Sequence, residues 1–215
     1  MILEEDLCIL HSDEYCKIEN DFNLVERIDK GDKTIMDLKI NVNQKNLYSI
    51  FCKTGKNGNK EDNSKLLFMS FLNFPDGVYL EIKDDCIICH VIELKKNPKG
   101  KIPNIGKQLM SAKYHIISLF SIMGIDLNKV EIYYYIGYVR DDEAKADEYN
   151  KKMKMKKIIP GTLQVRPQKL VDWDNDIITS KWGKYTFREQ FKKIKLNFKQ
   201  QIDGFDYFYE ELDFI

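Results

Sequence analysis

The sequence lacks the features that mark membrane-spanning and secreted proteins. No apolar run in its 215 residues approaches the ~20 residues needed to span a bilayer. The N-terminal stretch "MILEEDLCIL" carries acids where a signal peptide would carry Lys or Arg. The five cysteines are odd in number and have no repeated pair spacing, which favours reduced thiols over a disulfide framework. These absences predict an intracellular, cytoplasmic protein with no membrane partner.

Arginine is also scarce, and neither sign of charge is in excess. Only four of the 34 basic residues are Arg, and 34 acidic residues bring the formal net charge to zero. This balance does not exclude a nucleic-acid partner, because binding needs only a local basic patch. The length fits one elaborated domain or two small ones, and the hydrophobic share of 43% allows a sizeable core.

Hydrophobic periodicity predicts a helical N-terminal part followed by strands. Apolar residues are spaced at roughly helical intervals in residues 2–10 and 15–28. Strict alternation in "TIMDLKINV" predicts a half-buried strand at residues 34–42, with residues 46–52 as its hairpin partner. Residues 53–65 contain no large apolar residue, so we expect a surface loop there.

The next part of the chain predicts two strands, a helix and a further strand. "VYLEIK" and "CIICHVIELKK" are separated by Asp84-Asp85, which we expect to form a tight turn. "IGKQLMSAKYHIISLFSIM" predicts a helix that Asn104 caps and that ends at Gly124. "KVEIYYYIGYV" predicts the strand that follows this helix.

Helical signals return in the last third of the chain. Residues 141–157 begin acidic and end basic, as the helix dipole favours. Thr186 and Glu189 have the spacing of a capping box ahead of "FREQFKKIKLNFKQQI", and we expect that helix to end at Gly204. We interpret the tail "FDYFYEELDFI" as a terminal helix packed through its aromatic residues, or as a short partner-binding peptide.

Together these patterns predict an α/β fold in a single domain spanning residues 1–215. A central mixed β-sheet flanked by helices would form its core at about residues 34–140. Helical elaborations at residues 1–33 and 141–215 would add extra N- and C-terminal helices to that core.

The motif "CIICH" matches the C-x-x-C-H pattern of haem attachment, but its surroundings exclude that role. Cys86 and Cys89 lie in an apolar run typical of a buried strand, and residues three apart on a strand point to opposite faces. The two thiols therefore could not hold one haem or one zinc ion, and no second Cys/His pair lies at a useful spacing. We expect both cysteines to be small core residues and His90 to be a hydrogen-bonded core histidine.

The same strand pair brings two distant acids together. If the twin aspartates at 84 and 85 form the centre of the turn, Asp76 lies opposite Glu93. Opposed residues have Cβ atoms roughly 4.5–5.5 Å apart, where like charges repel. Two carboxylates at such a position need a shared proton or a cation, and a divalent metal ion is the simpler solution.

These residues resemble the motif of the PD-(D/E)XK nuclease superfamily. Pro75-Asp76 is followed, after 16 intervening residues, by Glu93-Leu94-Lys95 on an apolar strand with a helix next. The order of predicted elements over residues 34–140 is similar to the core of that family. Acid-x-Lys alone is a weak signal that recurs in this chain. The alternative interpretation is a simple Pro-Asp-Gly turn beside a solvated strand end.

The resemblance implies a metal-dependent endonuclease that hydrolyses phosphodiester bonds, with DNA favoured over RNA. Asp76, Glu93 and the backbone carbonyl of Leu94 would hold Mg²⁺, for which Mn²⁺ would substitute. Lys95 would orient a metal-bound water or help to deprotonate it. Gln108, near the start of the following helix, would position the attacking water or contact the substrate backbone, and the alternative is an ordinary polar residue in the first helical turn.

The resemblance also suggests further residues. Glu26 is the candidate for the additional acid that many family members supply from a helix before the strands, and the alternative is an ordinary acid on a solvated helix face. His115 shares a helix face with Gln108 and would line the cleft, or else lie in the core. Four lysines just past the acids would meet phosphates and give a salt-dependent affinity, or else belong to an ordinary solvated loop, and these are Lys96, Lys99, Lys101 and Lys107.

Several alternatives remain open at the level of the sequence. Small enzymes of this kind suit restriction, defence or phage and mobile-element DNA processing, and they often form homodimers that cut both strands. The main alternative is a catalytically inactive nuclease-like or other α/β module for binding or immunity. A second alternative is a viral RNA endonuclease, which usually adds a metal-binding His upstream. Only His11 precedes Asp76 in this chain.

Overall fold

The structure is a computed structural model that describes residues 15–43, 46–50, 74–141, 172–182 and 185–214. In these ranges it contains strands β1–β12, the long helix α1 (Ile102–Ile122) and the short 3₁₀ helix η2 (Leu127–Lys129). The helix expected at residues 2–10 and the loop expected at 53–65 lie outside the described residues, as does all but the first residue of the helix expected at 141–157. No helix within the described ranges is long and apolar enough to cross a membrane.

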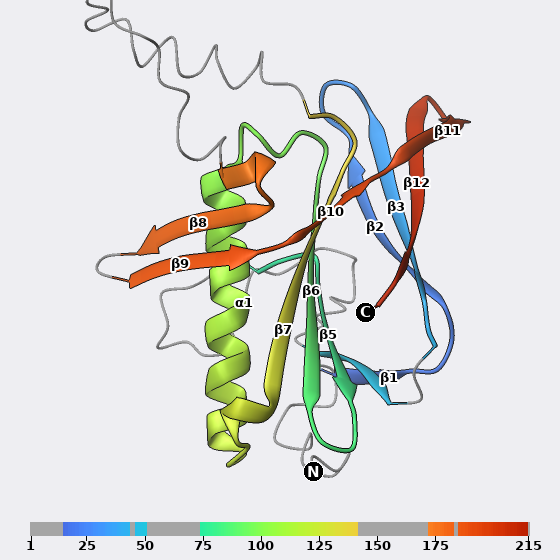
Figure 1. Ribbon diagram of the computed structural model, residues 1–215. Coiled ribbons are helices and arrows are strands. Elements are labelled where there is room, and N and C mark those ends of the chain that lie inside the picture. Colours follow the sequence, from blue (N-terminus) through green and yellow to red (C-terminus); the bar gives the residue numbers. More distant parts are fainter. Residues whose placement is uncertain (1–14, 44–45, 51–73, 142–171, 183–184, 215) are drawn as a thin grey trace, which may run out of the picture.

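A six-stranded mixed sheet forms the centre of the fold (Figure 1). β6, β7 and β10 are parallel to one another, whereas the pairs β1–β4, β4–β5 and β5–β6 are antiparallel. α1 connects the end of β6 to the start of β7, as a parallel pair requires. The α/β class with a central mixed sheet is confirmed. The strand order is β1 (Tyr15–Ile18), β4 (Leu47–Ile50), β5 (Gly77–Ile82), β6 (Ile87–Lys95), β7 (Val130–Tyr138) and β10 (Lys192–Lys195).

The β5–β6 hairpin has the register that the sequence predicts. Its pairs run from Ile82 opposite Ile87 to Gly77 opposite Ile92. The Lys83 N–H donates to the Cys86 carbonyl at 2.9 Å, so the turn is centred on the twin aspartates at 84 and 85. This register places Asp76, immediately before β5, next to the end of β6.

Helix α1 begins earlier than the sequence predicts and ends where expected. Lys101 is the N-cap residue and makes no side-chain cap hydrogen bond, so the assignment of Asn104 as the cap is wrong. A proline in the first turn explains the earlier start, because its fixed φ suits that position and its missing N–H needs no partner there. At the other end Gly124 has φ +71°, which closes the helix as expected.

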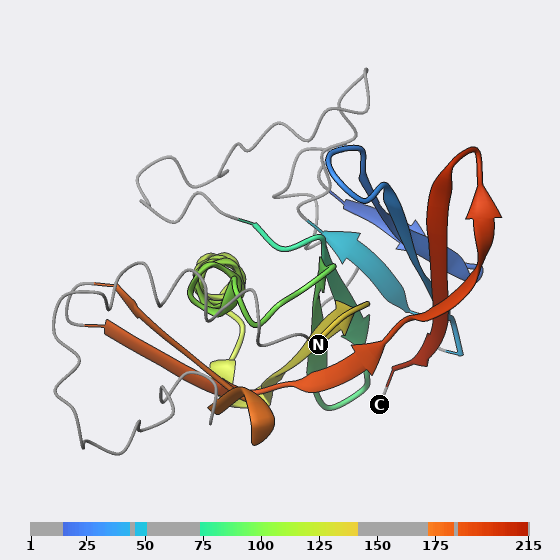
Figure 2. The ribbon, with the colours of Figure 1, turned by 90° about the horizontal axis from the view of Figure 1, so that it is seen from above.

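Two smaller sheets pack around the six-stranded sheet and α1 (Figure 2). A four-stranded sheet packs against one face of the six-stranded sheet, whereas α1 covers the other face. The hairpin of β8 (Ile177–Trp182) and β9 (Tyr185–Gln190) packs along one side of α1, and β9 also contacts β7. The order in the four-stranded sheet is β11 (Asn197–Ile202), β12 (Phe205–Asp213), β3 (Thr34–Asn41) and β2 (Phe22–Ile28).

Alternation along β6 divides the hydrophobic core between its two faces. Cys89 and Val91 belong to the cluster that packs beneath α1. Ile92 and Leu94 belong to the cluster between the two larger sheets, together with residues such as Met36 of β3. β6 is therefore buried on both faces, as a central strand in an α/β protein should be.

The structure corrects the prediction of helices near the N-terminus. Residues 15–28 form β1 and β2, not a helix. Burial alternates along β2, and its backbone pairs with β3. β3 is the strand predicted at 34–42, but its partners are β2 and β12. The prediction that it forms a hairpin with residues 46–52 is wrong, because β4 pairs with β1 and β5 in the other sheet.

The predicted C-terminal helices are also wrong within the described residues. The sequence with the apparent capping box forms β9, β10 and β11 in turn. Asp203 and Gly204, both at positive φ, form the turn between β11 and β12. The aromatic tail is β12, which lies between β3 and β11. Hydrogen bonding to strands distant in the sequence thus overrides the local helical pattern.

Candidate active site where β5 begins and β6 ends

Asp76 is fixed by the backbone of the neighbouring strand. Its Oδ2 accepts a hydrogen bond from the Leu94 N–H at 2.7 Å. The contact follows from the hairpin register, which sets the residue before β5 beside the last residues of β6. A carboxylate that accepts from a backbone N–H cannot rotate freely, so the Asp76 side chain has a defined orientation.

Glu93 and Lys95 lie on the same face of β6 and form an ion pair. Glu93 is fully buried, and its Oε1 contacts the Lys95 Nζ. Its Oε2 is buried and accepts no hydrogen bond from any described residue. The Lys95 Nζ also donates to the Leu94 carbonyl at 2.9 Å and lies 3.9 Å from the Asp76 Oδ2.

Glu26 joins this group from the second sheet. Its Oε1 lies 3.9 Å from the Lys95 Nζ. The prediction that this acid comes from a helix is wrong, because Glu26 lies on β2, where it occupies the inward-facing set of positions with Leu24 and Ile28. The carboxylates of Glu26, Asp76 and Glu93 therefore all approach one ammonium group.

One ammonium group cannot neutralise three carboxylates, and the pKa values reflect this imbalance. Burial, followed by the charge of Asp76, raises the pKa of Glu93 to about 8 against the opposing effect of Lys95. Burial alone would lower the pKa of Lys95, but the carboxylates of Glu93, Asp76 and Glu26 outweigh burial and raise it. The most buried carboxyl thus tends to keep its proton while the lysine stays charged.

The donor set has the chemistry that Mg²⁺ prefers. Asp76, Glu93, Glu26 and the Leu94 carbonyl offer only oxygen atoms, the ligands of hard divalent cations. The buried Glu93 Oε2, which accepts no hydrogen bond from a described residue, is one of the oxygen atoms that could bind such an ion. In the described part of the chain, no group of three or more His, Cys, Asp or Glu residues is arranged to hold a metal ion as it stands. The Lys95 ammonium provides the positive charge among these acids.

Gln108 contacts the chain segment that leads into Asp76. Its Nε2 donates to the Phe74 carbonyl at 3.1 Å. The rings of His115 and Phe74 pack in a T-shaped arrangement with centroids 4.6 Å apart, and His115 Nδ1 lies 2.8 Å from the Ser111 carbonyl. His115 is buried, as its core interpretation predicts. Both residues therefore hold residues 74–76 against α1.

Replacing Gln108 by Ala should lower any activity of this site through Asp76. We expect cleavage to fall about 10-fold, because the segment before Asp76 loses an anchor and the carboxylate shifts. The lost hydrogen bond should also cost about 1 kcal/mol of unfolding free energy. Asn104→Ala, an exposed change in the first turn of the same helix, is the control. Equal activities of the two variants would show that the Phe74 contact is unimportant.

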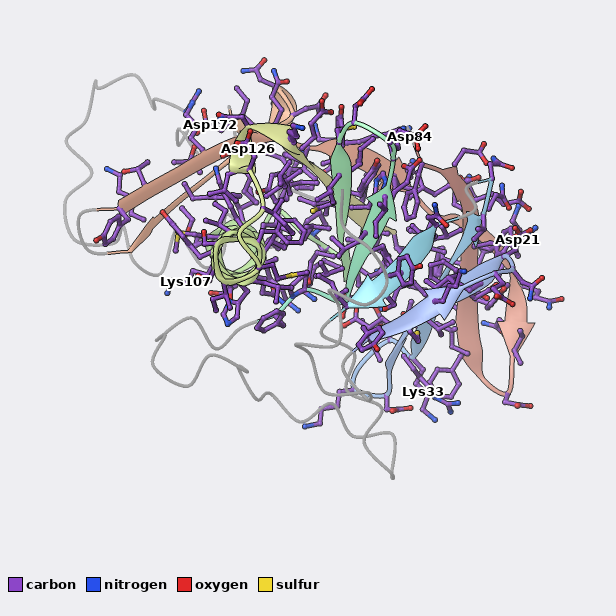
Figure 3. All side chains as sticks on the ribbon, turned by 90° about the horizontal axis from the view of Figure 1, so that it is seen from below. Asp21, Lys33, Asp84, Lys107, Asp126 and Asp172 are labelled. Carbon is purple, nitrogen blue, oxygen red and sulfur yellow. The ribbon has the colours of Figure 1, made fainter. Side chains whose placement is uncertain are left out.

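The four lysines predicted to bind phosphates do not form one exposed patch. Lys96 contacts Asp32, and Lys99 is buried with its Nζ 3.2 Å from the Asp141 Oδ1. Lys107 lies on the side of α1 that faces away from β5 and β6 (Figure 3). Lys101, at the start of α1, is exposed. The structure thus separates residues that are close in the sequence.

His90 is the hydrogen-bonded core residue that strand parity predicts. Its Nδ1 lies 3.1 Å from the Tyr135 hydroxyl, and its Nε2 lies 3.4 Å from the Glu81 Oε2. Phe214 stacks on its ring with centroids 3.8 Å apart. Burial lowers the pKa of His90 to about 3, so the ring is neutral. The same hairpin register sets Glu81 opposite Ile88, two residues before His90 on β6, so the predicted register already places Glu81 near His90 although Glu81 is not among the residues named from the sequence.

Cys86 and Cys89 behave as strand parity requires. Cys89 is fully buried in the core beneath α1, whereas Cys86 is partly exposed just before β6, so its assignment to the core is only partly right. Both are free thiols. Burial raises the pKa of Cys89 far above its usual value, which makes this thiol unreactive.

Comparisons of the chain with protein-family models, with curated proteins and with solved structures find no match. The class of protein must therefore be inferred from the fold and from the carboxylate–lysine group described above.

Proposed function

We propose that the protein is a metal-dependent endonuclease that hydrolyses phosphodiester bonds in nucleic acid, with DNA favoured. The observation that carries this proposal is the meeting of Asp76, Glu93 and Lys95 where β5 begins and β6 ends. The resemblance of these positions to the PD-(D/E)XK pattern supports the same conclusion. Restriction, defence or phage-type processing of DNA is the setting that suits such an enzyme.

Each residue has a defined part in this proposal. Asp76, Glu93 and the Leu94 carbonyl would hold Mg²⁺ or Mn²⁺, and Glu26 would add a further carboxylate. When bound, the ion would lower the pKa of a water and offset charge on the phosphate. Lys95 would orient that water through its ammonium group and would stabilise the developing negative charge. Because the site is largely buried, these electrostatic effects are stronger than they would be in bulk water.

The test is a cleavage assay with three substrates. Purified protein is incubated with plasmid, single-stranded DNA and RNA in Mg²⁺, in Mn²⁺ and in EDTA. We expect metal-dependent cleavage that Asp76→Asn reduces by about 100-fold or more, since it removes a ligand charge. Asp84→Asn, an exposed change in the turn of the same hairpin, should leave the rate unchanged. Cleavage in EDTA, or equal rates for the two variants, would reject the assigned site. Cleavage of RNA alone would assign the site to an RNA endonuclease.

A non-catalytic binding or immunity module is the second candidate. The ion pairs of Lys95 with the acids favour it, because they already offset the carboxylate charge without a metal ion. Such a module would cleave no substrate in any metal. Its affinity for nucleic acid would also be unchanged by substitutions of Glu93 and Lys95.

A further inference from the structure

The turn between β2 and β3 is attached to the ends of β6 and β7. The Lys96 Nζ donates to the Asp32 carbonyl at 2.7 Å and lies 3.5 Å from the Asp32 Oδ2. Arg140, just after β7, donates from Nη1 to the same Oδ2 at 3.2 Å. The Arg140 N–H also donates to the Lys96 carbonyl at 2.8 Å, which ties the two cationic residues to each other. Figure 1 shows the β2–β3 turn beside the segments that follow β6 and β7.

The same β2–β3 hairpin carries Glu26 toward the site. Glu26 is opposite Met36 of β3, a fully buried residue of the core between the sheets. Lys95 and Lys96 are consecutive, yet Lys95 contacts Glu26 on β2 and Lys96 contacts Asp32 in the turn. The hairpin is therefore joined to the end of β6 at two points, one at the site and one at its tip.

We propose that Asp32 is a positioning residue that holds Glu26 in place as the third carboxylate of the metal site. This inference depends on the proposed function, because it needs the carboxylates to bind a divalent cation. The Glu26 carboxylate is brought to Lys95 by a strand of the second sheet, so its position depends on how that sheet docks. The contacts of Asp32 with Lys96 and Arg140 fix this docking at the nearest turn.

The exposure of Asp32 and Arg140 indicates that their ion pair adds little to the stability of the fold, so its role would be to position the hairpin. The side chains of Asp32 and Arg140 are 58% and 40% exposed, and ion pairs at such positions contribute little to stability. The interior of the hairpin is held by buried apolar residues of β3 such as Met36 and Leu38. The backbone carbonyl of Asp32 accepts a hydrogen bond from the buried Thr34 hydroxyl at 2.9 Å, and an alanine at position 32 keeps this carbonyl. Loss of the Asp32 carboxylate should therefore leave the protein folded while it loosens the approach of Glu26 to the site.

The experiment measures Mn²⁺ binding by electron paramagnetic resonance, with no substrate present. Glu26→Gln should weaken binding about 10-fold, and Asp32→Ala should do the same through Glu26, in the range typical of residues that orient metal ligands. The double variant should bind no more weakly than Glu26→Gln alone. Arg140→Ala should have a smaller effect in the same direction. Asp29→Ala, in the same turn and paired with the exposed Arg27, should leave the affinity unchanged.

The possible outcomes separate this inference from the proposed function. Wild-type protein that binds no Mn²⁺ overturns both. Two results would overturn the role of Asp32 and leave the metal site intact. One is normal Mn²⁺ affinity in Asp32→Ala. The other is a double variant whose loss of Mn²⁺ affinity is the product of the losses in Asp32→Ala and Glu26→Gln. If Asp32→Ala does not fold, Arg140→Ala and its double variant with Glu26→Gln decide the matter by the same criterion, because Arg140→Ala retains the Lys96 contacts.

Discussion

Lys95→Met is expected to reduce metal-dependent cleavage by roughly 10²- to 10⁴-fold, the usual contribution of a group that assists proton transfer and stabilises charge. Methionine keeps most of the volume of the lysine stem but removes the ammonium group from among the carboxylates of Glu26, Asp76 and Glu93. Initial rates on a plasmid substrate in Mn²⁺ measure this loss.

The stability of the same variant should depend more strongly on divalent cations than that of the wild type, because no ammonium group competes with the ion for the carboxylates. Removal of one partner from a buried ion pair lowers the free energy of unfolding by about 3 kcal/mol or more. The lower value applies here because Glu93 can take up a proton and so avoid an unpaired buried charge. Thermal unfolding in EDTA should therefore occur at a lower temperature than in the wild type. Mn²⁺ at about 100 times the dissociation constant of the variant should restore about 2.7 kcal/mol, because it binds only the folded state. The same Mn²⁺ concentration should add less to the wild type, in which the Lys95 ammonium group competes with the ion and weakens its binding.

Lys83→Met is the matched control for Lys95→Met. Lys83 pairs with the buried Glu81 at the opposite end of the β5–β6 hairpin, with Nζ and Oε1 3.3 Å apart. This variant should keep its cleavage rate, and its unfolding temperature should respond to Mn²⁺ as that of the wild type does. An Mn²⁺ response of Lys95→Met no larger than that of Lys83→Met would mean that the acids form a structural ion cluster.

The stability of the metal-free protein should decline as the pH rises from about 5 to about 8. The pKa of Glu93 is raised from 4.5 to about 8 in the folded state, first by burial and then by the charge of Asp76. Between these values the folded protein holds a proton that the unfolded chain has lost, so stability falls with rising pH and levels off above pH 8. At about 1.4 kcal/mol for each unit of pKa, the loss is on the order of 4 kcal/mol.

Glu93→Gln should remove this pH dependence and make the protein more stable than the wild type above pH 8. The amide has a similar shape and carries no charge to bury. Urea unfolding in EDTA at pH 5.5, 7 and 8.5 measures the effect. Glu189→Gln, at a partly exposed residue paired with Lys113, should retain the wild-type slope. A wild-type stability that rises over this range would show that Glu93 is ionised in the folded protein.

The sequence predicts the part of the site that depends on local structure. A two-residue turn at Asp84 and Asp85 and an apolar run after it set the hairpin register, and this register brings Asp76 beside Leu94. Lys95 shares a face with Glu93 because strand residues two apart always do. These contacts need only the geometry of one hairpin, so they follow from about twenty consecutive residues.

The C-terminal strands could not be predicted from apolar spacing alone. Phe187, Phe191 and Ile194 are buried at intervals of four and three, which is also the spacing of a helix face. Phe187 lies instead on β9, Phe191 lies between β9 and β10, and Ile194 lies on β10. Of these two strands, β10 is the one that pairs with β7. One local signal pointed to strands: Asp-Gly at 203–204 favours a hairpin turn over a helix end.

The contribution of the second sheet to the site was also beyond the sequence pattern. In "FNLVERI" the apolar residues fit a helix as well as a strand, so Glu26 could be named as a candidate acid but not placed correctly. Asp32 gave no signal at all, because its partners Lys96 and Arg140 are 64 and 108 residues away along the chain. Such contacts depend on how two sheets pack, which no local pattern records.

The most direct test of the metal site is anomalous diffraction from crystals of the protein soaked in Mn²⁺. The proposal predicts one strong anomalous peak within coordination distance of the Asp76 and Glu93 carboxylates and the Leu94 carbonyl, and no such peak in Glu93→Gln crystals treated in the same way. A fully occupied soak with no peak among these residues, or a peak that persists in Glu93→Gln, would contradict it.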